Sequence, residues 1–296
     1  MRRLRIGLVV VAVATLTACG LRNGGGVERQ GPAGDGVMRV VTEKDFDHRN
    51  FANPLQVQNR WWPLQPGTEF DYQGSAVEGD QRIRRRVVVT VSDLVKVVDG
   101  VPAIVLWERD YNGDELVEAE LAFYAQDNHG NVWHLGQYPE EYEDGELAGA
   151  PAWIAGQQGA RAGLAMLANP VPGPSYSQGW GPAVDYSDRA RVYKVGQETC
   201  VAAGCFQDVV VTDEFALDEP EARQLKYYAP GVGNVRVDWM GRDEEKEVLS
   251  LVRVTTLADA AMAEVRTQVR ALDRNAYEVA EAYAATPPVE GPLPVR

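Results

Sequence analysis

The sequence predicts a mainly β fold with some α structure: a single curved antiparallel sheet, a half-barrel meander of about ten strands, and a C-terminal amphipathic helix. Three observations lead to this prediction. Apolar and polar residues alternate with a period of two between Thr68 and Thr256, turn residues separate the alternating runs, and the apolar spacing changes to three and four after residue 256. Strands and helices do not alternate along the chain, so a parallel doubly wound sheet is not expected.

The first 18 residues are typical of a lipoprotein signal peptide. Three arginines precede an apolar stretch at 6–16, which is too short to span a membrane, since a spanning helix needs about 20 residues. Residues 16–19 read Leu-Thr-Ala-Cys and resemble a bacterial lipobox. The resemblance implies attachment of diacylglycerol to the Cys19 thiol and cleavage before it. The alternatives are an ordinary secretory signal with a coincidental cysteine and an uncleaved anchor.

Residues 19–55 are expected to contain the lipidated cysteine and a flexible tether. Seven glycines lie between residues 20 and 36, and a segment of this composition cannot bury apolar surface. The β domain is expected to span 56–256, with folded structure beginning between Pro54 and Trp62. The rest of the sequence has no apolar run of membrane-spanning length. We therefore expect the domain to lie on the outer, extracytoplasmic side of the cell membrane, held there by its lipid.

Four hairpin-linked strands come first in the predicted sheet. Tight turns separate them, including Asp99-Gly100 and Asn112-Gly113, dipeptides that accept the positive φ of a short hairpin. On the second of these strands Val101, Ala103, Val105 and Trp107 form an apolar face, and Glu108 and Asp110 lie on the opposite, polar face. The four predicted ranges are 81–98, 101–111, 115–126 and 132–138.

Residues 145–189 interrupt the alternation. This stretch is rich in glycine and proline and is expected to form a long loop excursion rather than a second domain. It contains Trp153 and Trp180, so we expect it to pack back onto the sheet. Extended chain resumes after the excursion, with predicted strands at 191–197, 206–215, 222–229, 235–240 and 247–256.

The last element, 257–286, is predicted to be an amphipathic helix. Residues Thr256-Leu257-Ala258-Asp259 match the pattern of a capping box, and Pro287-Pro288 ends the helix and begins a tail at 287–296. The helix is expected to pack on the sheet. A partner-binding helix or a helix on the membrane surface is the alternative.

Three segments resemble uncharacterised bacterial lipoproteins of an actinobacterial type. They are Lys226–Arg236, Pro66–Tyr72 and Trp107–Tyr124, and the similarity covers roughly residues 60–256. The resemblance implies a strongly curved antiparallel sheet, similar in outline to the half-barrel of lipoproteins of the LolA, LolB and LppX type. These motifs mark the fold and contain no catalytic residues, so the resemblance implies no activity.

Cys200 and Cys205 are expected to form a disulfide. Once Cys19 is lipidated, they are the remaining thiols in an oxidising compartment. A redox-active pair is the alternative, but the spacing is not that of a C-x-x-C motif.

No metal site is predicted. His129 and His134 lie five residues apart without further ligands of defined spacing. The run Asp110–Glu115 superficially resembles a calcium loop, yet it lacks the glycine at position six and the glutamate at position twelve. It is interpreted as a charged hairpin turn.

The charge and the missing motifs narrow the class of function. Lys and Arg number 29 against 43 Asp and Glu, a net charge of −14, and this balance disfavours a nucleic-acid partner. The sequence contains no serine-hydrolase elbow, metalloprotease motif, P-loop or dinucleotide motif. The chain is therefore not expected to be an enzyme, and no cofactor is expected beyond the diacylglycerol on Cys19.

Aromatic residues suggest a lined concave face. Seven tryptophans and twelve tyrosines suit a wide sheet with an incompletely filled interior, and simple core filling is the alternative. The first hypothesis is a non-enzymatic binding module for an apolar or amphipathic envelope ligand, a lipid or glycolipid. A structural or protein-interaction accessory of the envelope is the second, and a cell-wall hydrolase is the third. The candidate lining residues are Trp107, Trp133, Trp153, Trp180, Trp239, Tyr227 and Tyr228.

Overall fold

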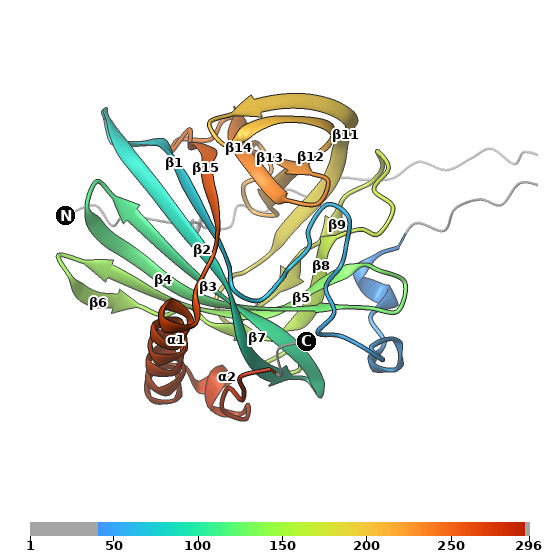
Figure 1. The fold of residues 1–296 in the computed structure, drawn as a ribbon, viewed down its shortest axis with the longest axis vertical. Helices are drawn as coiled ribbons and strands as arrows, with labels where there is room; N and C mark the ends of the chain where they lie inside the picture. Colours follow the sequence, from blue (N-terminus) through green and yellow to red (C-terminus); the bar gives the residue numbers. More distant parts are fainter. Residues whose placement is uncertain (1–40, 294–296) are drawn as a thin grey trace, which may run out of the picture.

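A computed structural model describes residues 41–293, in which fifteen strands join one antiparallel sheet. Figure 1 shows that the sheet is strongly curved, with the C-terminal helix on its outside. The predicted fold class is confirmed, with more strands than the ten expected. The signal peptide, Cys19 and the Gly-rich stretch at 20–36 lie outside the described residues.

The first five strands form a regular meander. The bounds of the second, third and fourth strands agree closely with the predicted ranges, because each strand alternates in polarity and each turn has the residues that a tight hairpin requires. The fifth strand begins where it was predicted and continues five residues further, and no range was predicted for the first. Asn112 ends one strand and Glu115 begins the next, so the run that resembled a calcium loop is a hairpin turn. The strands are β1 (Thr68–Glu78), β2 (Gln81–Val98), β3 (Val101–Asn112), β4 (Glu115–Gln126) and β5 (Val132–Glu143).

The excursion at 145–189 packs against the sheet as predicted, and it does so by forming short strands. β6 and β7 pair with the later residues of β5, and β8 pairs with its first residues. The short strands are β6 (Glu146–Gly149), β7 (Trp153–Ile154), β8 (Arg161–Met166), β9 (Tyr176–Ser177) and β10 (Gly179–Trp180).

The second half of the sheet is another meander, and its last strand pairs with β1. Cys200 and Cys205 are opposite each other in the first hairpin and form the predicted disulfide. The strands are β11 (Asp188–Val201), β12 (Gly204–Ala216), β13 (Ala222–Ala229), β14 (Gly233–Gly241) and β15 (Val248–Thr256).

One short segment bridges the two edges of the sheet. The strand order runs from β10 and β8 at one edge to β11 and β9 at the other. A single residue, Gln178, separates β9 from β10 along the chain. Gly179 pairs with Ala162 of β8, and Tyr176 pairs with Ala190 of β11. Residues 176–180, called here the bridging segment, therefore make the curved sheet enclose an interior.

Helix α1 (Asp259–Val279) covers the outer face of the sheet. Its apolar stripe packs in one core cluster with residues of β3 and β4, including Leu121 and Phe123, which confirms the predicted packing. The predicted capping box is wrong, because the helix begins after Ala258, whose side chain cannot accept a hydrogen bond. The helix also breaks at Ala280, where the backbone is extended, and a short helix α2 (Glu281–Ala284) follows.

The chain before β1 contacts the sheet in two places. Two 3₁₀ helices, η1 (Glu43–Asp45) and η2 (His48–Asn50), lie within the range assigned to the tether. Phe46 packs against Trp133 with a ring separation of 5.2 Å. Further along, Arg60 accepts a backbone hydrogen bond from the β13–β14 turn, and Leu64 is buried among the residues of the inner face.

Candidate functional site

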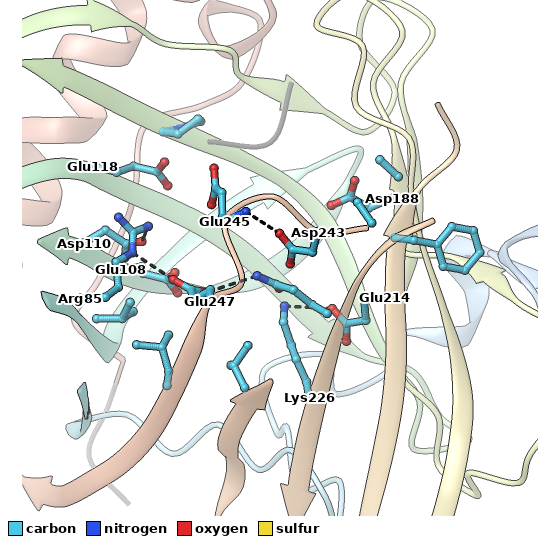
Figure 2. A pocket seen from close by; sticks show the side chains of 18 of the residues that line it. Arg85, Glu108, Asp110, Glu118, Asp188, Glu214, Lys226, Asp243, Glu245 and Glu247 are labelled. Carbon is cyan, nitrogen blue, oxygen red and sulfur yellow. Dashed lines mark hydrogen bonds and ion pairs between the residues drawn. The ribbon is translucent and has the colours of Figure 1, made fainter. Parts of the chain in front are cut away.

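A cavity of about 2080 Å³ lies inside the curved sheet, lined by strands of both meanders. Ligand cavities usually measure roughly 300–1,000 Å³, so this interior is large enough for a ligand bigger than a typical metabolite. Figure 2 shows side chains from several strands pointing into it. Since apolar residues also cover the outer face, both faces of the first meander are buried to some extent.

The cavity has an apolar half and a charged half. Neighbouring antiparallel strands run in opposite directions, and the charged residues lie near the start of β2, β4 and β13 and near the end of β3. These charged residues therefore gather at one end of the curved sheet. Along each strand the lining changes from apolar to charged: Val89 to Arg85 on β2, Leu106 to Asp110 on β3, Tyr124 to Glu118 on β4, and Tyr228 to Lys226 on β13.

Three aromatic rings meet in the apolar half. The Trp62 ring lies 4.9 Å from that of Tyr124 and 5.9 Å from that of Tyr228, all three lining the cavity. Leu64 lines the same half, so the loop at 54–64 supplies part of its apolar wall. Such aromatic clusters offer a large contact area to an apolar ligand group.

Five carboxylates form a ladder across three strands of the charged half. Glu108 of β3 is directly opposite Glu120 of β4, while Asp110 of β3 is opposite Glu118 of β4, which is opposite Glu141 of β5. Directly opposed side chains have Cβ atoms about 4.5–5.5 Å apart, and like charges in such pairs are destabilising. All but Glu120 line the cavity. We call these five residues the carboxylate ladder.

Cationic side chains are few in the cavity, and each is engaged with a carboxylate. Fifteen carboxylates line it against four cationic side chains. Arg85 donates to Asp110 at 2.7 Å and to Glu247 at 3.0 Å, and Lys226 lies 2.9 Å from Glu214. Among the described residues, no ion pair includes Glu108, Glu118 or Glu120. Carboxyl groups therefore greatly outnumber cationic side chains in the wall of the cavity.

Burial changes the protonation of these groups. It raises the pKa of Glu108, Asp110, Glu118 and Glu120, and repulsion between carboxylates adds to the rise for all four, although Lys226 opposes it at Glu108. Burial also raises the pKa of Asp188 to about 6 and that of Glu245, helped by repulsion from a neighbouring glutamate, to about 7. These carboxyl groups therefore retain protons at a pH where ordinary carboxyl groups have lost theirs.

The free energy of unfolding should consequently fall between pH 5 and pH 8. A carboxyl group whose folded pKa is raised stabilises the fold below its unfolded pKa of about 4, and this contribution is lost as the pH rises through the folded pKa. We expect the Tm to be lower at pH 8 than at pH 5 by about 5 °C. Thermal unfolding followed by circular dichroism measures this. The other charged groups facing the ladder are Arg85, Asp188, Glu214, Lys226, Glu245 and Glu247.

The variant Glu118→Gln/Glu120→Gln should flatten this pH dependence and raise the Tm at pH 8 by about 2–4 °C, because it removes two like charges. Glu198→Gln on β11 is the matched control, since Glu198 is exposed and does not line the cavity. A Tm that is unchanged or lower in the double variant would show that the ladder carries no repulsive charge.

Of the seven predicted aromatic residues, Tyr228 lines the cavity. The other six lie elsewhere. Trp133 packs in the outer core and donates to Asp127, and Trp153 stacks on Tyr186 with a ring separation of 4.8 Å. The remaining four lie beside cationic side chains: Trp107 beside Arg109, Trp180 beside Arg161, Tyr227 beside Arg236 and Trp239 beside Lys246.

The ladder residues were assigned to the polar face of the meander, and their role in a cavity was not predicted. A signal was present in the sequence, because Glu108, Asp110, Glu118 and Glu120 share one face of two adjacent strands. The helix covers the apolar face, so the polar face is the one that curves inward. No cluster of three or more His, Cys, Asp or Glu residues suited to a metal is found between residues 41 and 293.

The architecture is that of a protein in which a curved antiparallel sheet surrounds a cavity and a helix covers the convex face of the sheet. The cavity has an apolar half and a charged half. No family model and no curated protein matches the chain. Two solved structures are similar in fold, one from Bacteroides fragilis described as an exported protein with a YmcC-like fold, the other a Parabacteroides distasonis protein described as a lipoprotein. Their TM-scores are 0.40 and 0.39; each is 12% identical, covering 67% of this chain and 99% of its own.

The similarity to carriers of the LolA, LolB and LppX type stays a prediction, as does the actinobacterial origin. In the part of the chain that the structure describes, no helix is long and apolar enough to cross a membrane.

Proposed function

We propose that this protein is a non-enzymatic binding module that holds an amphipathic molecule in its cavity. One observation carries the proposal: a cavity of about 2080 Å³ that is apolar in one half and charged in the other. In this proposal lipidation at Cys19 tethers the module to the outer side of the membrane, where amphipathic envelope molecules are at hand. Each methylene group moved from water into the apolar half would contribute about 0.8 kcal/mol.

The protonation pattern supports binding over hydrolysis. Acid–base catalysis by two carboxyl groups needs environments that move their pKa values apart. All five ladder residues have their pKa shifted upward, chiefly through burial. A wall of similar carboxyl groups is suited to holding a ligand, whereas a hydrolase needs one acid and one base.

Filling the apolar half should weaken binding. Val89 lines the cavity from β2 and is half-buried, so Val89→Trp would place an indole in open space instead of overpacking a core. The test uses the full chain with Cys19→Ser, which carries no acyl group, and N-phenyl-1-naphthylamine, a neutral probe that fluoresces in apolar surroundings. We expect Val89→Trp to weaken probe binding at least about tenfold, which is about 1.4 kcal/mol.

Val195→Trp is the matched control, because Val195 is exposed on β11 and does not line the cavity. It should bind the probe as the parent chain does. The proposal fails if the parent chain does not bind the probe, or if both tryptophan variants bind it equally well.

A further inference from the structure

Resting on the proposed function, we infer that the ligand is a cationic amphiphile, whose ammonium group lies against the carboxylate ladder while its apolar chain occupies the apolar half. The inference concerns the charge of the head group, which the proposed function leaves open. It follows from the arrangement of the ladder, from one buried oxygen atom and from the distribution of cations in the wall.

Most of the carboxylate ladder has no ion-pair partner among the described residues, and it lies at the boundary of the two halves. Glu108 follows Leu106 on β3, and Glu120 precedes Ala122 on β4, so carboxylates and apolar side chains alternate within a few residues on the same face. Arg85 already bonds to Asp110 and Glu247, and Lys226 is paired with Glu214. The cations of the wall are therefore engaged, and the described chain supplies no ion-pair partner for Glu108, Glu118 or Glu120.

Asp110 gives an independent indication of a missing donor. Its side chain lines the cavity, the residue is only 7% exposed, and its Oδ1 atom has no hydrogen-bond partner, although Oδ2 accepts from Arg85. A buried acceptor without a donor costs about 1–3 kcal/mol. An ammonium group brings three donors and no acceptor, which matches a site made of acceptors.

Other head groups fit this wall less well. A phosphate or sulfate group would meet fifteen carboxylates and only four cationic side chains. A neutral sugar head would bring no positive charge to set against the opposed carboxyl groups. A bare metal ion would leave the apolar half empty. Because like charges opposed in a sheet cost stability, a cation that separates them also relieves repulsion.

The test compares three amphiphiles with the same twelve-carbon chain: dodecylamine, dodecyl maltoside and dodecyl phosphate. Each displaces N-phenyl-1-naphthylamine from the Cys19→Ser chain. We expect dodecylamine to act at a concentration at least about tenfold lower than either of the others, which corresponds to about 1.4 kcal/mol. In Glu118→Gln/Glu120→Gln this ratio should fall toward one. Glu198→Gln, outside the cavity, should retain the ratio of the parent chain.

The outcomes separate the two claims. If all three amphiphiles displace the probe at equal concentrations, the cationic inference is overturned and the binding function stands. If dodecyl phosphate acts at the lowest concentration, the wall recognises an anion, which also overturns the inference. If calcium ions alone remove the preference for dodecylamine, the ladder is a metal site and not an ammonium site. If no amphiphile displaces the probe, the proposed function itself fails.

Discussion

Asp273→Ala is expected to lower the free energy of unfolding by about 3–5 kcal/mol, because it leaves the buried ammonium of Lys96 without its counter-ion. Lys96 is 0% exposed and Asp273 is 3% exposed. The Lys96 Nζ donates to Asp273 Oδ1 at 2.9 Å and to the Tyr277 hydroxyl at 2.9 Å. The same carboxylate accepts from the Tyr283 hydroxyl at 2.6 Å, so one substitution breaks the contact of helix α1 with both β2 and α2.

The loss should diminish at high pH. Burial lowers the pKa of Lys96 to about 8, although the bond to Asp273 opposes this shift. A lysine with a lowered folded pKa binds its proton more tightly in the unfolded chain, so stability rises as the pH increases from about 8 to about 10.5. Without Asp273 the neutral amine is favoured further. Urea unfolding of the parent and of Asp273→Ala at pH 7 and pH 10 measures both effects.

The double variant Lys96→Met/Asp273→Leu is the control, because replacing a buried ion pair with apolar residues is often neutral or stabilising. It should recover most of the stability that Asp273→Ala loses. If the double variant is as unstable as the single one, the cause is lost packing and not an unpaired charge.

Gly163→Ala is expected to separate the bridging segment from β8, with a loss of about 3 kcal/mol. A Cβ atom at Gly163 would lie 2.2 Å from the carbonyl carbon of Gln178 and 2.2 Å from the nitrogen of Gly179. Both are backbone atoms, so neither can rotate away as a side chain would. The strand and the bridging segment must move apart, and the pairing of Gly179 with Ala162 is lost.

The separation of the bridging segment from β8 should be visible both in probe binding and in thermal stability. If the bridging segment keeps the interior closed, Gly163→Ala should weaken N-phenyl-1-naphthylamine binding as it lowers the Tm. Gly173→Ala is the matched control in the same excursion, because the nearest atom to its added Cβ lies 3.7 Å away. Equal Tm values for the two variants would contradict the close approach at Gly163.

The carboxylate ladder lowers the stability of the sheet, and the rest of the fold compensates for this loss. Opposed carboxylates destabilise the sheet, and sites that bind ligands commonly sacrifice stability in this way. The outer core and the buried Lys96–Asp273 pair lie on the other face, away from the ladder. Variants of the ladder should therefore change ligand preference with little effect on how α1 packs.

The early strands could be predicted because their bounds and pairing depend on residues close together in the sequence. In β3 and β4 the period-two alternation and the Asn112-Gly113 turn fix both the strand bounds and the register. The disulfide between Cys200 and Cys205 was predictable for the same reason, since a hairpin places them opposite each other. The lipobox at 16–19 likewise depends on adjacent residues alone, and it stays a prediction.

The faces of β2 show where local order stops being sufficient. Alternation places Lys96 with the polar, even-numbered residues. The odd-numbered Val87 and Val89 line the cavity, so the even-numbered side chains face outward. Leu94 and Val98 pack with the helix in the outer core. Lys96 is buried because α1 covers this end of the outer face. The alternation of residue types does not reveal which part of a face another segment covers.

The amino-acid sequence by itself thus determined that the chain forms an antiparallel sheet and where most of its strands begin and end. It also determined which segment forms the helix that covers the sheet. These features depend on residues that are neighbours along the chain. Only the folded structure decided which face became the interior. The helix took the apolar face, and curvature then brought Glu108, Glu118 and Glu120 together around a cavity whose closure depends on residues 176–180. Contacts between segments so far apart in sequence leave no periodic trace in the order of amino acids.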